Sequence, residues 1–272
     1  MRNTLHVQPT QREKAEAFRA LHEGDPFVIP NPWDAGSARV LEALGFKALA
    51  STSSGFAFTL GRLDGAATLD EVAEHAEALD AATGLPVSID LENGYGPEAE
   101  DAAHAVRRAA EAGAVGGSIE DYDPSGSIYE RGHALERVAA AIEEARRQDF
   151  PFTLTARAEN HLRGNPDLAD TISRLQAFEE AGADVLYAPG LRSVEEIRTV
   201  CNAVAKPVNV LAVPGLTMAE LVEAGARRVS VGGSLTWVAL RGMVAAAEAI
   251  RDGGDFGALA ARVPVGEWLG PR

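Results

Sequence analysis

The sequence predicts an α/β fold, a (β/α)₈ barrel in which parallel strands alternate with helices. Four segments share the order helix end, glycine and apolar strand, and they read LEALGFKALAST, AEAGAVGGSIED, EEAGADVLYAPG and VEAGARRVSVGG. Each glycine suits the left-handed position that ends a helix. Other short apolar runs raise the count to about eight strands, which is the number a barrel of this kind needs. A doubly wound open sheet is the weaker alternative.

The expected elements follow from these runs in chain order. We expect strands near residues 26–31, 48–53, 86–92, 116–121, 152–159, 184–190, 207–212 and 227–234. Helices with apolar residues at three-to-four spacing lie between them, as in TLDEVAEHAEALDAAT. The N-terminal helix is an addition to the barrel, and WVALRGMVAAAEAIRDG with FGALAARV forms an extended C-terminal helical region. With 272 residues and 46% hydrophobic content, we expect a single domain over residues 1–272.

Composition narrows the class of partner. The formal net charge is -15, with 40 acidic against 25 basic residues and no basic cluster, which argues against nucleic-acid and anionic-membrane partners. Cys201 is the single cysteine, so one chain can build neither a disulfide framework nor a Cys-based zinc site. The polar start lacks a secretory h-region. We therefore expect a cytoplasmic enzyme with a small-molecule partner, although a soluble binding protein would share this composition.

Carboxylates cluster at the expected ends of neighbouring strands. Asp90 and Glu92 end the third strand in VSIDLENGYG, and residues i and i+2 of a strand point to the same side. Glu120 ends the fourth strand, and the C-terminal ends of barrel strands meet at one mouth. Carboxylate and water oxygens suit Mg²⁺, and Mn²⁺ accepts similar ligands. The three acids predict a divalent metal site; solvated strand ends paired with Arg157, or helix N-caps, are the alternative.

Several neighbours of these acids are candidates for substrate contact. Arg157 in TARAEN offers a cationic fork for a carboxylate or phosphonate, or a salt bridge within the rim. In the loop after the second strand, Ser54 and the N–H groups of Gly55 and Phe56 could form an anion nest. Asn209 lies within the seventh strand. The candidate catalytic residues are Arg157, Tyr95 and Glu159.

The segment 122–133, YDPSGSIYERGH, follows the fourth strand and contains little apolar surface. We expect it to be mobile in the empty site and to close as a lid. Its candidates for bringing a polar group toward a ligand are Tyr129, Glu130, Arg131 and His133. An ordinary surface loop is the alternative.

From IPNPWDAGSARVLEALGFKALASTSSG through GGSL, the chain resembles the isocitrate lyase/phosphoenolpyruvate mutase superfamily. The resemblance implies a Mg²⁺-dependent (β/α)₈ barrel that acts on 2-oxo acids through a metal-stabilised enolate. It also implies a homotetramer whose neighbouring subunits swap the last barrel helix. SIDLENGYG resembles the metal segment, which places Asp90 and Glu92 in the metal shell, with Glu in place of the usual second Asp.

The same resemblance assigns further residues. GGSIED resembles the strand that supplies the third acid, Glu120, and LGRLD the segment whose acid, Asp64, reaches the metal through water. TSSG resembles the cradle of the substrate carboxylate. Arg157 matches the arginine that holds the other end of the substrate.

The departures from the family pattern leave more than one chemistry open. The lyases carry a Lys-Lys-Cys-Gly-His loop where this chain has YDPSGSIYERGH, and LYAPGL replaces the Glu or His that follows the sixth strand. The first hypothesis is a C–C bond lyase or decarboxylase acting on a 2-oxo acid or dicarboxylate. The alternatives are P–C chemistry, as phosphonopyruvate hydrolysis or phosphoenolpyruvate mutation, and a catalytically silent barrel that binds a dicarboxylate.

Overall fold

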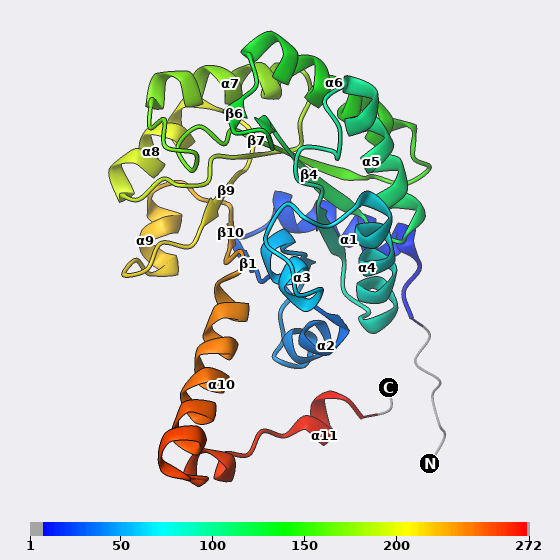
Figure 1. The fold of residues 1–272 in the computed structure, drawn as a ribbon. Coiled ribbons are helices and arrows are strands. Elements are labelled where there is room, and N and C mark those ends of the chain that lie inside the picture. The colour runs from blue at the N-terminus through cyan, green and yellow to red at the C-terminus, as the bar shows by residue number, and fades with distance from the viewer. Residues whose placement is uncertain (1–7, 271–272) are drawn as a thin grey trace.

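A computed structural model describes residues 8–270 and contains an eight-stranded parallel sheet rolled into a nearly closed barrel (Figure 1). The strand order is β1-β10-β9-β8-β7-β4-β3-β2. The barrel strands are β1 (Phe27–Ile29), β2 (Leu49–Ala50), β3 (Val87–Asp90), β4 (Gly116–Glu120), β7 (Thr153–Arg157), β8 (Val185–Tyr187), β9 (Val208–Leu211) and β10 (Arg228–Ser230). A hydrogen bond links the two edge strands of this sheet: the Ala50 N–H in β2 donates to the carbonyl of Pro30, the residue after β1, at 3.1 Å. The barrel and its strand positions are confirmed, each strand being shorter than expected.

Most of the helices cover the outside of the barrel, and the last long one extends away from it (Figure 1). In chain order, the α-helices of the described residues are α1 (Gln11–Glu23), α2 (Ala35–Ala43), α3 (Ser53–Thr59), α4 (Leu69–Ala82), α5 (Ala99–Glu111), α6 (Arg131–Arg147), α7 (Leu168–Glu180), α8 (Val194–Ala203), α9 (Met218–Glu223), α10 (Ser234–Gly253) and α11 (Val265–Trp268). Many begin at capping boxes. In α4, for example, Thr68 accepts from the Glu71 N–H while the Glu71 carboxylate accepts from the Thr68 N–H. These local signals fix where each crossover helix begins.

The strands alternate between apolar and polar residues. In β7, Leu154 and Ala156 belong to the hydrophobic core between sheet and helices, whereas Thr155 and Arg157 are buried polar residues. In β10, Val229 joins the core, while its neighbours on both sides are polar. Because side chains alternate along a strand, one set packs under the helices and the other points into the barrel. The inward-facing residues of these two strands are therefore polar.

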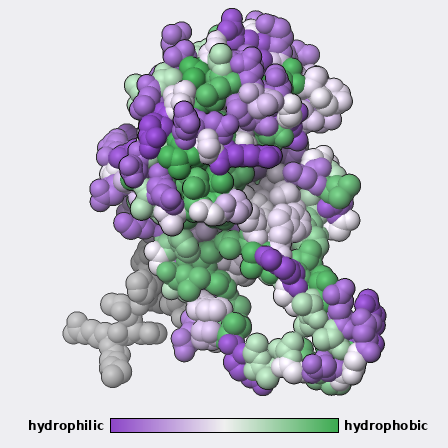
Figure 2. All heavy atoms as spheres, turned by 90° about the vertical axis from the view of Figure 1, so that its left-hand side faces the viewer, coloured by the Kyte–Doolittle hydropathy of each residue, from purple (hydrophilic) through white to green (hydrophobic). Residues whose placement is uncertain are grey.

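The last long helix, α10, departs from the barrel. Thr236 is its one buried residue, and the helix extends away from the sheet with the C-terminal segment turning back from its far end (Figure 1). Exposed apolar side chains accompany charged ones on this arm (Figure 2). Near α11, the Arg39 guanidinium donates to the Gly270 carbonyl at 2.6 Å. The N-terminal helix and the extended C-terminal helices are confirmed.

Two expectations reach beyond the described part of the chain. The polar start includes residues 1–7, which lie outside it, and the single domain was expected over residues 1–272. The domain assignment stays a prediction for that reason. Across residues 8–270, no helix is both long enough and apolar enough to cross a membrane.

Two buried histidines predict a loss of stability in acid. Burial lowers the pKa of His22 to about 3 and that of His75 to about 4. Between these values and the ordinary pKa of about 6.5, the unfolded chain binds protons that the folded chain does not, so stability falls as the pH drops below that ordinary value. Each histidine should contribute a loss of about 2 kcal/mol at pH 5 relative to pH 8.

His75→Phe tests this linkage. The His75 ring stacks on Phe56 with centroids 4.1 Å apart, and its Nε2 has no hydrogen-bond partner among residues 8–270. Phenylalanine should keep the stack and remove the titrating group. Urea unfolding at both pH values should show a smaller acid loss in this variant, while the exposed His104→Gln should leave the loss unchanged. An equal loss in wild type and His75→Phe would contradict the assignment.

Candidate functional site

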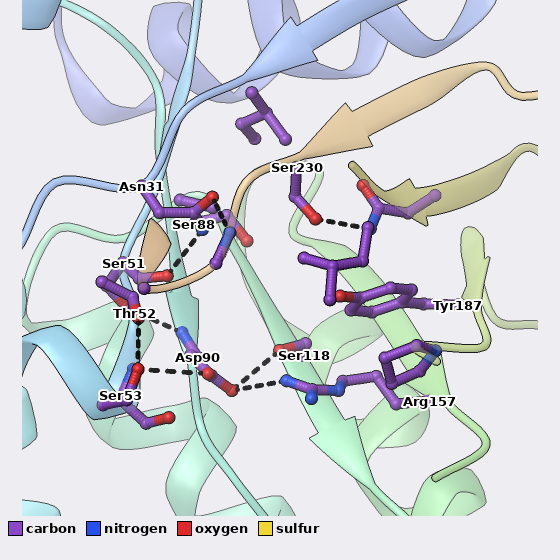
Figure 3. A pocket seen from close by; sticks show the side chains of 18 of the residues that line it. Asn31, Ser51, Thr52, Ser53, Ser88, Asp90, Ser118, Arg157, Tyr187 and Ser230 are labelled. Carbon is purple, nitrogen blue, oxygen red and sulfur yellow. Dashed lines mark hydrogen bonds and ion pairs between the residues drawn. The ribbon is translucent and has the colours of Figure 1, made fainter. Parts of the chain in front are cut away.

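A cavity of about 170 Å³ opens at the C-terminal ends of the barrel strands (Figure 3). Its polar lining comes from several strands and the loops that follow them: Asn31, Ser51, Thr52, Ser53, Ser54, Asp64, Ser88, Asp90, Ser118, Arg157, Tyr187, Asn209, Arg228 and Ser230. Pockets for drug-sized ligands have roughly 300–1,000 Å³. This mouth cavity therefore suits a small molecule with few heavy atoms.

Asp90 lies at the end of β3 and is held by neighbours on several sides (Figure 3). Its N–H donates to the Ser51 hydroxyl at 2.8 Å. Its Oδ1 accepts from Arg157 Nη1 at 3.0 Å and from the Ser118 hydroxyl at 3.3 Å, while Oδ2 accepts from the Ser53 N–H at 3.4 Å. The carboxylate is thereby fixed at the cavity wall.

Arg157 joins three carboxylates. Beyond its contact with Asp90, its Nη2 lies 2.9 Å from Glu120 Oε1 and 2.8 Å from Glu159 Oε1. Both glutamates are buried, and burial raises the pKa of Glu120 well above its usual range despite the nearby guanidinium. These contacts agree with the rim salt bridge and leave Arg157 little capacity for a substrate. The structure thus brings the third-, fourth- and fifth-strand candidates together at one place.

Glu92 lies in the turn after β3 and not, as expected, within the strand. The strand β3 ends at Asp90, and Glu92 has φ +47°, so the argument that both acids share one strand face is wrong. The Tyr95 hydroxyl donates to Glu92 Oε1 at 3.2 Å. Burial raises the pKa of Glu92 to about 7, and the negative charges of Asp90 and Asp64 raise it further. Glu92 and Tyr95 border a hollow beside the mouth cavity.

The turn after β3 is strained. Among residues 8–270, the non-glycine residues with positive φ are Glu92 and Tyr95, at +47° and +65°. Such conformations cost about 1–3 kcal/mol each and concentrate at functional sites. Between them, Gly94 has φ +87°, and a Cβ there would lie 2.8 Å from the Ala102 Cα. The Asn-Gly-Tyr-Gly sequence therefore allows the tight turn that positions Glu92.

The donor set around the cavity fits a hard cation. Within the described ranges, no three His, Cys, Asp or Glu side chains lie close enough together to chelate a metal directly. Mg²⁺ needs only one or two carboxylates and keeps several waters. Asp90 and Asp64 line the cavity, and after burial, which is the largest cause, their negative charges contribute to the raised pKa of Glu92. The residues present fit Mg²⁺, whose site stays a prediction.

The loop after β2 differs in detail from the expected anion nest. Residues 53–59 form α3, where the Phe56 N–H donates to the Thr52 carbonyl at 2.9 Å and the Gly55 N–H to the Thr52 hydroxyl at 3.4 Å. Both N–H groups thus have partners within the chain, and substrate binding at Gly55 and Phe56 stays a prediction. Ser54 does line the cavity. Gly55 instead permits close packing, since a Cβ would lie 2.7 Å from Thr236 Oγ1.

The lid candidates are held by neighbours. Segment 122–128 contains a two-stranded hairpin, β5 (Tyr122–Asp123) with β6 (Ser127–Ile128). The Tyr129 hydroxyl accepts from Asn93, Glu130 caps α6, Arg131 contacts Ser173 and His133 contacts the Pro97 carbonyl. None of these four side chains is among the residues that line the mouth cavity. Lid closure stays a prediction, and it would have to come from the hairpin.

Sequence reasoning missed Arg163, Tyr187 and Arg228. Arg163 lies 3.3 Å from both Glu120 and Glu159 and stacks on Tyr122. It lies several residues after the end of β7, so the alternation of side chains along a strand could not predict its position. Tyr187 had a usable signal, because it follows two apolar residues in β8 and carries a polar hydroxyl. Arg228 had one too, because it and Ser230 flank Val229 in β10, so both polar side chains point to the side of the sheet opposite to Val229.

These observations define a class: a (β/α)₈ barrel with an ionic cavity at the C-terminal mouth, where barrel enzymes have their active sites. The family model described as phosphoenolpyruvate phosphomutase matches residues 18–251. The chain therefore belongs to that family, within the isocitrate lyase/phosphoenolpyruvate mutase superfamily, and is an enzyme of the lyase and mutase type.

Curated relatives cover most of the chain. An uncharacterized protein of Mycobacterium tuberculosis is 36% identical over 90% of this chain and 92% of its own length. A 2-methylisocitrate lyase of Halalkalibacterium halodurans is 31% identical over 73% of this chain and 67% of its own. An oxaloacetate decarboxylase of Rhodopseudomonas palustris is 30% identical over 82% and 78%. The named relatives thus catalyse more than one reaction.

Solved structures agree with this placement. A Burkholderia cenocepacia protein described only as a lyase/mutase has a TM-score of 0.93 and 50% identity, covering 96% of this chain and 97% of its own. Oxaloacetate acetylhydrolase in complex with the product oxalate has a TM-score of 0.85 and 27% identity, covering 94% and 93%. The fold is shared across enzymes that differ in substrate.

Proposed function

We propose that this protein is a Mg²⁺-dependent enzyme that cleaves or forms the C–C bond next to the 2-oxo group of a small 2-oxo acid or related dicarboxylate. The observation that carries the proposal is the joining of Asp90, Glu120 and Glu159 by Arg157, which lines the mouth cavity together with Asp90. The cavity size suits such an acid. Relatives named for 2-methylisocitrate and oxaloacetate chemistry support the same class of substrate.

Asp90 would hold the metal, with Glu92, Glu120 and Asp64 binding its waters. When bound, Mg²⁺ would polarise the 2-oxo group and stabilise the negative charge that develops during the reaction. Ser54 would contact the substrate carboxylate from the start of α3, the part of the expected cradle that lines the cavity. Arg157 acts mainly by fixing the carboxylates. Its capacity for substrate is limited by the contacts it already makes.

P–C bond chemistry is the second candidate, supported by the family description as phosphoenolpyruvate phosphomutase. The same cavity would then hold phosphonopyruvate or phosphoenolpyruvate. A catalytically silent dicarboxylate-binding barrel is the third. We also propose a cytoplasmic location, which the single Cys201 suits because structural disulfides are rare in that compartment.

A substrate panel tests the proposal and separates the candidates. Oxaloacetate, 2-methylisocitrate and phosphonopyruvate are each incubated with protein and Mg²⁺, and pyruvate is measured with a coupled dehydrogenase. Pyruvate from either of the first two supports the C–C reaction, and pyruvate from phosphonopyruvate supports the P–C hydrolase. Phosphorus NMR detects mutase activity. No reaction with any of them, together with a raised melting temperature in a dicarboxylate, would favour the silent barrel.

We further propose a homo-oligomer, a tetramer built from helix-swapped dimers. Support comes from α10, where Val238 and Met243 are 53% and 61% exposed on a helix that extends from the barrel. Burying such apolar side chains against a second copy would stabilise the assembly. Light scattering should give a tetramer for the wild type and smaller species for the Val238→Glu/Met243→Glu variant. Glu248→Lys is the control. It changes a charge on the same helix but leaves the two apolar side chains in place. A monomeric wild type would contradict the proposal.

A further inference from the structure

The strained turn that contains Glu92 is held by a buried guanidinium from another part of the chain. Arg137 lies in α6 and is 1% exposed. Its Nη2 donates to the carbonyl of Asn93, the residue after Glu92, and its Nη1 donates to the Glu98 carbonyl at 2.7 Å, directly before α5 begins. One side chain therefore ties both ends of the segment 93–98.

The contacts of Arg137 with backbone carbonyls are ones that an apolar residue could not make. Its Cζ lies 4.7 Å from the centroid of the Tyr129 ring, and its Nε has no hydrogen-bond partner among residues 8–270. Taking a guanidinium out of water costs stability, and an apolar side chain of similar size would avoid that cost. The two donations to the segment 93–98 therefore point to a role beyond filling space.

Tyr129 holds the same turn from a second side. Its hydroxyl accepts from Asn93 Nδ2 at 3.2 Å, while Asn93 Oδ1 accepts from the Tyr95 N–H at 3.0 Å. The backbone of Tyr129 is itself fixed, because its carbonyl accepts from Arg174 Nη1 at 2.9 Å and its N–H donates to the Asp121 carbonyl at 2.9 Å. The carbonyl and the side chain of Asn93 are thus both held from outside the turn. Arg137 and Tyr129 are called the turn clamp below.

The turn needs such support because of its backbone conformation. Glu92 and Tyr95 both have positive φ, and strained residues of this kind persist only where their surroundings hold them in place. The two are also joined, since the Tyr95 hydroxyl donates to Glu92 Oε1 at 3.2 Å. A shift of Asn93, which lies between Glu92 and Tyr95 in the chain, would therefore displace the Glu92 carboxylate relative to Asp90.

We infer that Arg137 and Tyr129 are positioning residues for the metal site. By holding Asn93, they keep the Glu92 carboxylate where it can bind the waters of a cation on Asp90. Neither residue is among those that line the mouth cavity, so both act through the turn. The inference rests on the proposed function, because it requires Mg²⁺ beside Asp90.

Calorimetric titration with Mg²⁺ tests the positioning role. Arg137→Met fills similar space without the donors, and it should weaken Mg²⁺ binding about 10-fold, the lower end of the usual effect of losing a residue that orients metal ligands. Arg137→Lys keeps a donor for one of the two carbonyls, and its affinity should lie between those of Arg137→Met and the wild type. Equal affinity in Arg137→Met and the wild type would overturn the inference while leaving the proposed function in place.

Lys14→Met is the matched control for a general loss of stability. Lys14 is also a buried cation, 4% exposed, and its Nζ donates to the Thr83 carbonyl at 3.0 Å, shortly before β3 begins. It therefore supports the chain at the end of β3 opposite to the turn. This variant should lose stability and keep its Mg²⁺ affinity. A similar fall in Mg²⁺ affinity in both methionine variants would be an effect of destabilisation, and the positioning role would be wrong.

Tyr129→Phe is a milder variant that decides the question if Arg137→Met does not fold. It keeps the ring beside Arg137 and removes only the hydroxyl that accepts from Asn93. Mg²⁺ affinity should fall in this variant too, because the Asn93 amide loses one of its partners. Wild-type affinity in Tyr129→Phe would count against the clamp and, where Arg137→Met does not fold, would reject it.

Amide hydrogen exchange provides a readout that needs no metal. The Tyr95 N–H donates to the Asn93 side chain, so its protection reports how firmly the turn is held. This amide should exchange faster than in the wild type in Arg137→Met and Tyr129→Phe, and at the wild-type rate in Lys14→Met. Unchanged exchange in the first two would overturn the turn clamp. A wild type that binds no Mg²⁺ would instead contradict the proposed function, and with it the positioning of a metal ligand, while the exchange rates still decide whether the clamp holds the turn.

Discussion

Arg157→Ala should lower the free energy of unfolding by about 3–5 kcal/mol, since removing one partner of a buried ion cluster leaves the other charges uncompensated. Three carboxylates contact this guanidinium, those of Asp90, Glu120 and Glu159, and the last is completely buried. Their mutual repulsion would then act in a medium that screens it poorly. Turnover should fall with it, because the cluster sets the shape of the cavity. Urea unfolding at pH 8 measures the stability loss.

Arg163→Ala is the matched control. Arg163 lies 3.3 Å from Glu120 and from Glu159, but a third of its side chain is exposed. Solvent screens such a pair, so the loss should be at most about 1 kcal/mol. Similar losses in the two alanine variants would show that Arg157 is not the central cation of the cluster.

Asp90→Ala should abolish measurable Mg²⁺ binding and the activity that depends on it. Asp90 is the carboxylate fixed at the cavity wall by the Ser53 N–H, Ser118 and Arg157. The fold should survive, because Arg157 keeps its contacts with the two glutamates. Calorimetric titration with Mg²⁺ checks the first claim, and the melting temperature checks the second.

Asp70→Ala serves as the control for this variant. Asp70 is a carboxylate whose side chain is 83% exposed, on α4, where it pairs with Arg108. It should bind Mg²⁺ like the wild type, which excludes a general effect of lower negative charge. Unchanged Mg²⁺ affinity in Asp90→Ala would refute the metal assignment.

The barrel could be predicted because its signals are local and repeated. A glycine after each of several helices, such as Gly113 with φ +94°, precedes an apolar run at the expected strand position. The acids that end β3 and β4 then meet because parallel strands align their ends. Asp90, Glu120 and Arg157 were found in this way.

The features that the sequence could not predict arise in a turn, in a short helix and in tertiary contacts. Glu92 lies in a left-handed turn, which strand periodicity cannot describe. The N–H groups of Gly55 and Phe56 are engaged because Thr52 caps a short helix there. The occupation of Arg157 by three acids depends on tertiary distances, and so does the polar contact of Arg228 with Asn209. Sequence spacing carries no information about such contacts.

Calorimetry of oxalate binding, with Mg²⁺ and then with EDTA in its place, tests the central claim most directly. Oxalate is the product bound in the related oxaloacetate acetylhydrolase, and it is small enough for a cavity of about 170 Å³. The same titration of Asp90→Ala measures the background heat released by Mg²⁺ and oxalate in solution. If the mouth cavity holds a divalent cation and a small acid together, wild-type protein should bind oxalate with Mg²⁺ and not with EDTA. Equal binding under both conditions, or none with Mg²⁺, would contradict the account.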